Sequence, residues 1–212
     1  MKKQTNFIPV GHPNRPGTKL ESVKAIVVHY TENAATSMGA LANIRWWNRK
    51  YETKGGKFYE VGGEKLFRYG SAHVVCDADG VVLAVPTNEV AWAVGDKNFD
   101  GGFQEIAQRV FRGRQNMNSI SVEICNNNPP ENWPKAVENA KRWIVEHLSI
   151  FGLEIDVAGS LAPQQVTSVA EGKVLLLRHY DITGKICPKP FVENGGAWME
   201  FIQDVAGRLE AA

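Results

Sequence analysis

The sequence predicts a single α/β domain in which a central mixed β-sheet is flanked by α-helices. Short β-branched runs of strand length occur between longer segments that carry apolar residues every three or four positions. The two kinds of segment do not follow strict βαβ order, so we expect a mixed sheet and not a purely parallel one. At 212 residues, with 43% hydrophobic and 22% charged side chains, the chain can form one domain with a substantial core.

Five short runs of β-branched and aliphatic residues are predicted to be the strands. The pair Asp79-Gly80, between two of these runs, is typical of a tight hairpin turn. Residues 1–22 are instead expected to be an irregular lead-in, because prolines and glycines crowd the segment 9–17. The predicted strands are residues 23–28, 73–76, 81–85, 120–124 and 174–177.

Apolar residues at helical spacing predict three helices. The first covers residues 36–50 and carries Leu41, Ile44, Trp46 and Trp47. Two glycine-containing segments, 52–70 and 96–117, are expected to be loops or insertions that border a groove. The other two helices carry buried stripes, one of Val137, Ala140, Ile144, Leu148 and Phe151, and one of Trp198, Phe201, Ile202, Val205 and Leu209.

Charge and composition exclude several kinds of partner. The 24 basic and 23 acidic side chains leave a formal charge of +1, so we expect no nucleic-acid partner. The longest apolar runs, 25–28 and 174–177, are far shorter than a bilayer span, and we expect no membrane insertion. The opening Lys2-Lys3 is not followed by an apolar stretch, so we expect no signal peptide.

Two histidines and a cysteine are candidates for a metal site. His29 and His179 each follow a strand predicted to be buried, and Cys187 follows His179 after a glycine-containing loop. Imidazole and thiolate are good zinc ligands, and three protein ligands leave a fourth position open for water. The chain has three cysteines, an odd number that fits no disulfide framework and suits a reducing compartment. Taken alone, His29 is more readily explained as a hydrogen-bonded core residue, and the spacing of His179 and Cys187 alone could arise by chance; the three residues together favour a metal site.

The remaining histidines have weaker claims. His73 begins a predicted strand, where it could hydrogen-bond to loop backbone or orient a metal ligand without binding the metal itself. His12 lies in the proline-rich lead-in and His147 lies among polar neighbours on a helix, so both are expected to be solvated.

Glu123 and Lys185 are candidates for catalysis. Glu123 interrupts a strand that otherwise reads as buried, and burial would raise its pKa toward that of a general base or acid. The alternative is a core glutamate paired with an arginine. Lys185 lies two residues before Cys187, where its ammonium could stabilise a developing oxyanion, although a surface lysine is the commoner case. Cys76 and Cys125 lie within strands and are expected to be buried apolar residues.

Taken together, these residues resemble the type 2 N-acetylmuramoyl-L-alanine amidases, a family of zinc-dependent phage endolysins, bacterial autolysins and peptidoglycan-recognition proteins. The likeness spans residues 25–188, and the fourth motif looks most like amidases of Bacillus and its phages. The matching motifs, in family order, are residues 26–31, 71–73 with Asp79-Gly80, 88–96, 118–125 and 178–188.

The resemblance implies a role for each of these residues. His29, His179 and Cys187 would bind one Zn²⁺ per chain, and Lys185 would stabilise the transition state. Some members use a tyrosine where this chain has Ala72, whereas others use a glutamate at the position of Glu123, which is therefore expected to be the general base. By the same resemblance, Trp92 would line the groove for the substrate's stem peptide, unless it packs in the core.

The resemblance also implies a function. Residues 23–209 would be a catalytic domain that cleaves the amide bond between N-acetylmuramic acid and L-alanine of the stem peptide in bacterial peptidoglycan. The loops 52–70 and 98–115 look longer than in compact members, and no cell-wall-binding domain is expected in this chain. We expect a monomeric phage or prophage endolysin that stays in the host cytoplasm until lysis, or is released by another route.

Two other functions stay open on the sequence. A non-catalytic peptidoglycan-binding module of the same fold would differ by losing zinc ligands, typically the cysteine, which is present here as Cys187. A zinc hydrolase acting on another amide, such as a peptide bond, would share the same ligands.

Overall fold

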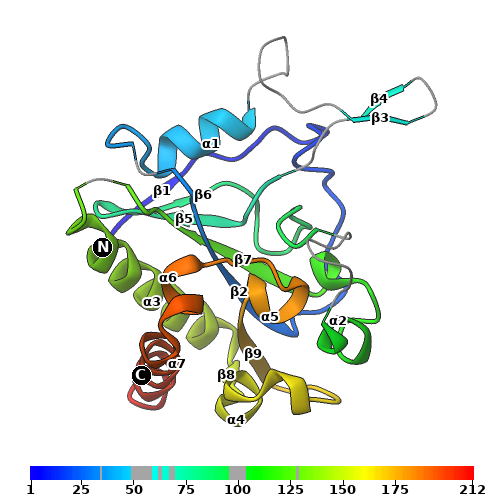
Figure 1. Ribbon diagram of the computed structural model, residues 1–212, viewed down its shortest axis with the longest axis vertical. Coiled ribbons are helices and arrows are strands. Elements are labelled where there is room, and N and C mark those ends of the chain that lie inside the picture. The colour runs from blue at the N-terminus through cyan, green and yellow to red at the C-terminus, as the bar shows by residue number, and fades with distance from the viewer. Residues whose placement is uncertain (34, 49–58, 62–63, 67–69, 96–103, 128) are drawn as a thin grey trace.

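The computed structural model describes residues 1–33, 35–48, 59–61, 64–66, 70–95, 104–127 and 129–212 (Figure 1). A seven-stranded sheet runs in the order β1-β6-β5-β7-β2-β9-β8, and a two-stranded sheet joins β3 to β4. Within the larger sheet, all neighbours are parallel except β5 and β6. The predicted domain with a mixed sheet and flanking helices is therefore confirmed. The strands are β1 (Lys2–Thr5), β2 (Ala25–Tyr30), β3 (Tyr59–Val61), β4 (Glu64–Leu66), β5 (Val74–Cys76), β6 (Gly80–Leu83), β7 (Ser119–Ile124), β8 (Glu154–Ile155) and β9 (Lys173–Arg178).

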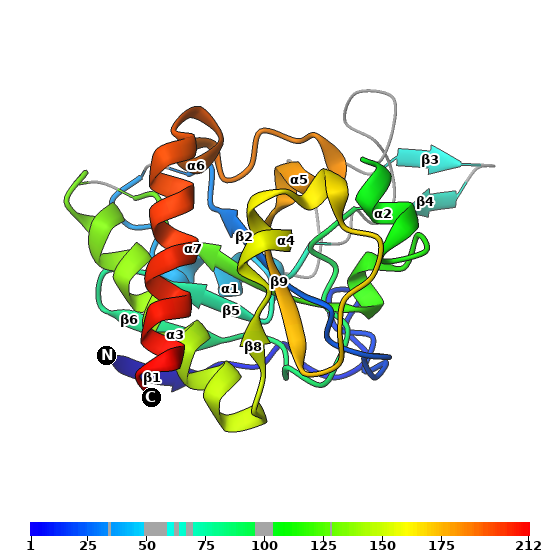
Figure 2. The same ribbon diagram turned by 90° about the horizontal axis from the view of Figure 1, so that it is seen from below.

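Helices cover both faces of the larger sheet (Figures 1 and 2). Ile26 and Val28 of β2 share a core cluster with α3, α6 and α7, whereas Ala25 and Val27 share another with α2. This alternation is the two-residue period of a strand buried on both faces. The helices are α1 (Ala40–Asn48), α2 (Glu105–Arg109), α3 (Asn132–Phe151), α4 (Val157–Leu161), α5 (His179–Thr183), α6 (Lys189–Glu193) and α7 (Gly195–Glu210).

The lead-in predicted to be irregular contains a strand, so that prediction is wrong for residues 2–5. β1 pairs in parallel with β6, and Lys2 lies opposite Gly80. A Cβ atom at Gly80 would lie 2.1 Å from the Lys2 carbonyl oxygen, so only glycine permits this approach. The side chains of β1 are polar and largely exposed, which explains why no apolar alternation marks this edge strand.

The two long helices were predicted correctly, with one exception in their buried stripes. Phe151 is 61% exposed, because it is the last residue of α3 and precedes the left-handed cap residue Gly152. Helix α1 begins at Ala40 and not at residue 36, while its predicted end at residues 49–50 lies outside the described residues. The Ala40 amide donates to the Asp77 carboxylate at 2.8 Å. This cap comes from a distant loop and therefore left no signal near residue 36.

The two segments expected to be loops contain regular structure. In the first, β3 and β4 form an antiparallel hairpin, while residues 52–58, 62–63 and 67–69 lie outside the described residues. In the second, α2 buries Ile106 and Ala107 against the sheet, while residues 96–103 lie outside them. The spacing of Ile106 and Val110 was a helical signal that glycines on either side obscured.

Among the described residues, no helix combines the length and apolar character needed to cross a membrane.

Candidate active site

One half of the candidate site lies on two adjacent strands. His29 of β2 lies opposite Glu123 of the parallel strand β7. Side chains alternate along a strand, so His29 and Glu123 share one face while Ile120, Val122 and Ile124 contribute to the core cluster on the other. The sheet register therefore sets an imidazole and a carboxylate side by side near the carboxyl ends of β2 and β7.

The other half is a short turn that follows β9. His179 is the first residue of α5, which ends at Thr183 and is capped by Gly184 in the left-handed conformation (φ 77°). The Tyr180 amide donates to the Cys187 carbonyl at 2.9 Å, and the Cys187 amide donates to the Lys185 carbonyl at 2.7 Å. These bonds fold residues 179–187 into a closed loop that carries His179, Lys185 and Cys187 together.

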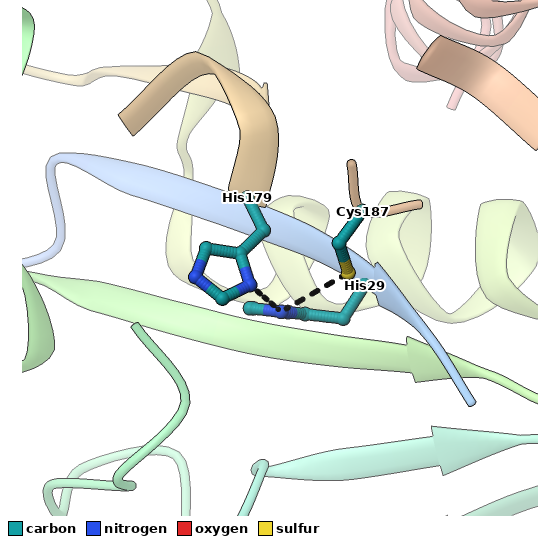
Figure 3. A group of neighbouring side chains, drawn as sticks. All are labelled: His29, His179 and Cys187. Atoms are coloured by element: carbon teal, nitrogen blue, oxygen red, sulfur yellow. Dashed lines mark hydrogen bonds between the residues drawn. The ribbon is translucent and has the colours of Figure 1, made fainter. Parts of the chain in front are cut away.

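The two halves bring His29, His179 and Cys187 into one buried cluster (Figure 3). The Nδ1 atoms of the two histidines lie 3.2 Å apart, and Cys187 Sγ lies 4.0 Å from His29 Nδ1. In tetrahedral zinc sites, bond lengths of about 2.1 Å to nitrogen and 2.3 Å to sulfur put two nitrogens about 3.4 Å apart and nitrogen about 3.6 Å from sulfur. All three ligand atoms lie within 4.8 Å of one another, so the cluster has the donor set of a zinc site and is slightly wider than a zinc-bound one.

The protonation of the two histidines suits metal binding. Burial lowers the pKa of His29 well below its usual value, and the nearby His179 and Lys185 lower it further. Burial and Lys185 lower the pKa of His179 to about 3. Both rings are therefore neutral at pH 7, the form in which imidazole binds metal.

Cys187 requires a partner to ionise. Burial raises the pKa of its thiol to about 12, with Glu123 adding to the effect. A bound cation deprotonates a coordinating thiol, and here the Tyr30 backbone amide donates a hydrogen bond to the sulfur, which favours the thiolate.

Glu123 lies beside this cluster with an unusual pKa. Burial raises the pKa of its carboxyl group to about 7, against the opposing effect of Lys185. Its Oε2 atom is buried without a hydrogen-bond partner among the described residues. The alternative of a core glutamate neutralised by an arginine is therefore not what the described residues show.

Lys185 borders the same cluster. Its ammonium lies 3.3 Å from the Glu32 carboxylate, which is 61% exposed. The positive charge of Lys185 lowers the pKa of all three buried groups, His29, His179 and Glu123.

The ring of His73 hydrogen-bonds to the backbone through both of its nitrogens. Its Nδ1 accepts from the Ser121 amide at 2.9 Å, so its Nε2 carries the proton and donates to the Glu89 carbonyl at 2.8 Å. Both ring nitrogens are thus bound to backbone, and neither is available to orient His29. Of the two roles expected for His73, the structure supports the hydrogen bond to loop backbone and contradicts the orientation of a ligand.

The groove role of Trp92 stays a prediction. Trp92 is partly buried, and its backbone exchanges hydrogen bonds with Ser71. Cys76 and Cys125 are fully buried and free, as expected for apolar strand residues.

His147 is not simply solvated, because its ring is stacked on Trp143 and also contacts Phe151. His12 is partly buried and accepts a hydrogen bond from the Asn14 amide, so it is not simply solvated either.

Sequence reasoning missed three residues around the site. Glu32 pairs with Lys185, and Arg178 forms a buried ion pair with Asp181. The spacing of Arg178 and Asp181, three residues apart where a strand becomes a helix, was a signal that could have found them. Glu32 left no such signal, because its partner lies far along the chain.

Comparison with known proteins yields one family and several relatives. A family model described as N-acetylmuramoyl-L-alanine amidase matches residues 19–190. The amidase BlyA of Bacillus subtilis (strain 168) is 28% identical over 207 residues, which cover 96% of this chain and 47% of BlyA. The amidase CwlL of Bacillus licheniformis is 28% identical over 209 residues, which cover 99% of this chain and 48% of CwlL. The chain thus spans about half the length of these curated relatives.

Solved structures share the fold. The catalytic domain of XlyA superposes with a TM-score of 0.64 at 24% identity, covering 95% of this chain and 99% of that domain. PlyL superposes with a TM-score of 0.63 at 22% identity, covering 97% of each chain. Because the family model covers well over half of the sequence, the chain belongs to the N-acetylmuramoyl-L-alanine amidase family.

Proposed function

We propose that this chain is a zinc-dependent N-acetylmuramoyl-L-alanine amidase that cleaves the amide bond between N-acetylmuramic acid and L-alanine in bacterial peptidoglycan. The observation that carries the proposal is the buried cluster of His29, His179 and Cys187 with Glu123 beside it, in a chain of the amidase family. A binding module of the same fold would need neither the complete ligand set nor a buried carboxylate.

His29, His179 and Cys187 would hold the ion through two nitrogens and one sulfur. When bound, zinc would act as a Lewis acid that polarises a carbonyl group and lowers the pKa of water toward about 7. Three protein ligands are the number found in catalytic zinc sites, whereas structural sites have four. The donor set therefore favours a hydrolase over a purely structural metal site.

Glu123 would move the proton. Its buried carboxylate would take a proton from the attacking water and return it to the departing L-alanine nitrogen. Lys185 would stabilise the negative charge that develops on the carbonyl oxygen. The ion pair with Glu32 keeps the Lys185 ammonium at the border of the cluster.

A digest of purified peptidoglycan tests the activity. We expect new amino groups and stem peptides that begin with free L-alanine, both abolished by a chelator and restored by Zn²⁺. Cys187→Ser should lose zinc and activity, whereas the matched variant Cys125→Ser, at another buried free cysteine, should keep both. New reducing sugars without new amino groups would show a glycosidase instead, and cleavage inside the stem peptide would show a peptidase.

The biological role that we propose is host lysis as a phage or prophage endolysin, with the enzyme held in the cytoplasm until it reaches the wall. Support comes from a fold neighbour titled "Mutant endolysin from Bacillus subtilis", which superposes with a TM-score of 0.61 at 24% identity. The test is expression in the cytoplasm of a susceptible Bacillus. Cells should lyse only when the membrane is permeabilised, and lysis without permeabilisation would contradict this role.

A further inference from the structure

Arg178 lies where the two ligand-bearing parts of the loop meet. Its backbone amide donates to Asp181 Oδ2 at 2.8 Å, and its Nη2 donates to Asp181 Oδ1 at 2.7 Å. Its Nη1 donates in the other direction, to the Phe191 carbonyl at 3.0 Å. Arg178 therefore joins the start of α5, which carries His179, to α6, which begins two residues after Cys187.

This contact set is buried and fixed from several sides. The Asp181 side chain is only 3% exposed and that of Arg178 is 16% exposed. The guanidinium also lies 5.4 Å from the Tyr180 ring centroid and 5.6 Å from that of Trp198. A guanidinium held by a carboxylate, a carbonyl and two aromatic rings has little freedom to move.

An ordinary helix cap does not account for all of these contacts. Helix α5 has five residues, too few to be stable alone, so the position of His179 depends on what holds its first turn. The hydrogen bonds between Arg178 and Asp181 hold this first turn. The bond to Phe191 adds nothing to the cap and instead ties down the chain beyond Cys187.

We propose that Arg178 and Asp181 are positioning residues that hold the segments of His179 and Cys187 together so that both side chains reach one zinc ion. This inference rests on the proposed function, because it takes these two residues as zinc ligands. Neither Arg178 nor Asp181 would contact zinc or substrate. Their effect would be on the geometry, and hence the affinity, of the metal site.

The chain offers a matched control at Arg15. Its Nε and Nη2 donate to the Glu89 carboxylate at 2.8 and 3.0 Å, and its Nη1 donates to the Ile8 carbonyl at 2.7 Å. Both side chains are 10% exposed. This is the same hydrogen-bond pattern in a similarly buried place, but it joins segments that carry none of the three proposed ligands.

The experiment measures zinc affinity by competition with a chelator, together with the visible spectrum of the Co²⁺-substituted protein and the unfolding temperature. We expect Arg178→Gln and Asp181→Asn to raise the zinc Kd about 10- to 100-fold. Both should also alter the Co²⁺ bands, which depend on tetrahedral coordination. Arg178→Lys keeps the positive charge but loses the planar guanidinium, so it should bind zinc more weakly than the wild type and more tightly than Arg178→Gln. If Arg178→Gln does not fold, Arg178→Lys replaces it in the test. Arg15→Gln should lower the unfolding temperature and leave Kd and spectrum unchanged.

Two results would overturn the inference while leaving the proposed function intact. One is wild-type Kd and wild-type Co²⁺ bands in the folded Arg178 and Asp181 variants. The other is an equal loss of affinity in Arg15→Gln, which would show a general effect of stability. A wild-type protein that binds no zinc in the same titration would instead overturn the proposed function, and the positioning role with it.

Discussion

His29 and His73 are similar in sequence context and burial but differ in what their ring nitrogens contact. Both lie at an end of a short β-branched run, both are almost fully buried, and burial lowers the pKa of both. His73 binds backbone through both nitrogens, whereas His29 faces His179 and Cys187 through Nδ1 and has no described partner at Nε2. Burial thus marks both histidines as unusual, and only the contacts of the nitrogens separate a candidate ligand from a structural residue.

The largest expected effect comes from removing the candidate ligand. His29→Ala should reduce bound zinc from about one per chain to a trace and reduce amidase activity below detection, because two remaining ligands do not hold a catalytic zinc. Metal analysis and the peptidoglycan digest measure both. Added zinc should raise the unfolding temperature of the wild type but not of the variant. Wild-type zinc content in His29→Ala would remove the distinction between the two histidines.

The next largest effect distinguishes the role of Glu123 from that of the candidate metal ligand His29. Glu123→Gln should keep about one zinc per chain and lower kcat by about 10²- to 10⁴-fold, the usual contribution of a general base. The amide is close in size to the carboxylate and does not ionise, so the fold should survive. Retained activity would exclude Glu123 as the base, while lost zinc would indicate that it helps to hold the metal.

The matching change at the structural histidine should act on stability. His73→Ala leaves the Ser121 amide and the Glu89 carbonyl buried without partners, which costs about 1–3 kcal/mol for each group. Urea unfolding of zinc-loaded protein should show this loss, with zinc content still near one per chain. Zinc lost in a folded His73→Ala protein would contradict the structural role.

The smallest effect is on the pH dependence of stability. In zinc-free protein, the pKa of Glu123 rises from about 4.5 to about 7 on folding, so the folded state holds a proton that the unfolded state releases. This contribution is complete below pH 4.5 and is lost as the pH rises through about 7. The free energy of unfolding should therefore fall by about 3 kcal/mol over this range relative to Glu123→Gln. Parallel curves for the two proteins would show that the carboxyl group is not desolvated.

Strongly apolar elements were predictable from the sequence, and weakly apolar ones were not. The observed limits of β2, β7 and β9 lie within two residues of the predicted ones, because buried parallel strands read as continuous apolar runs. The polar edge strand β1 depends on the backbone of β6, and the start of α1 depends on Asp77, so neither leaves a local pattern.

For the site, the sequence predicted which residues the fold would bring together. His29, His179 and Cys187 were identified from strand ends and loop spacing, and the structure clusters them, while their binding of zinc stays a prediction. The sequence assigned different roles to His29 and His73, but the backbone groups that bind the His73 ring were not predictable, since they lie on neighbouring segments far along the chain. The same is true of the reach of Arg178 to the Phe191 carbonyl.

The pairing of β2 with β9 gives the cluster a second property. His29 and His179 are 150 residues apart in the sequence, although His29 lies on β2 and His179 directly follows the neighbouring strand β9. An ion held by both would therefore be a cross-link that closes most of the chain into a ring. Closing so long a segment restricts the unfolded chain, and each doubling of its length adds about 0.6 kcal/mol to that restriction. Metal loading would then stabilise the whole domain, so that an enzyme without its ion would be easier to unfold and to digest.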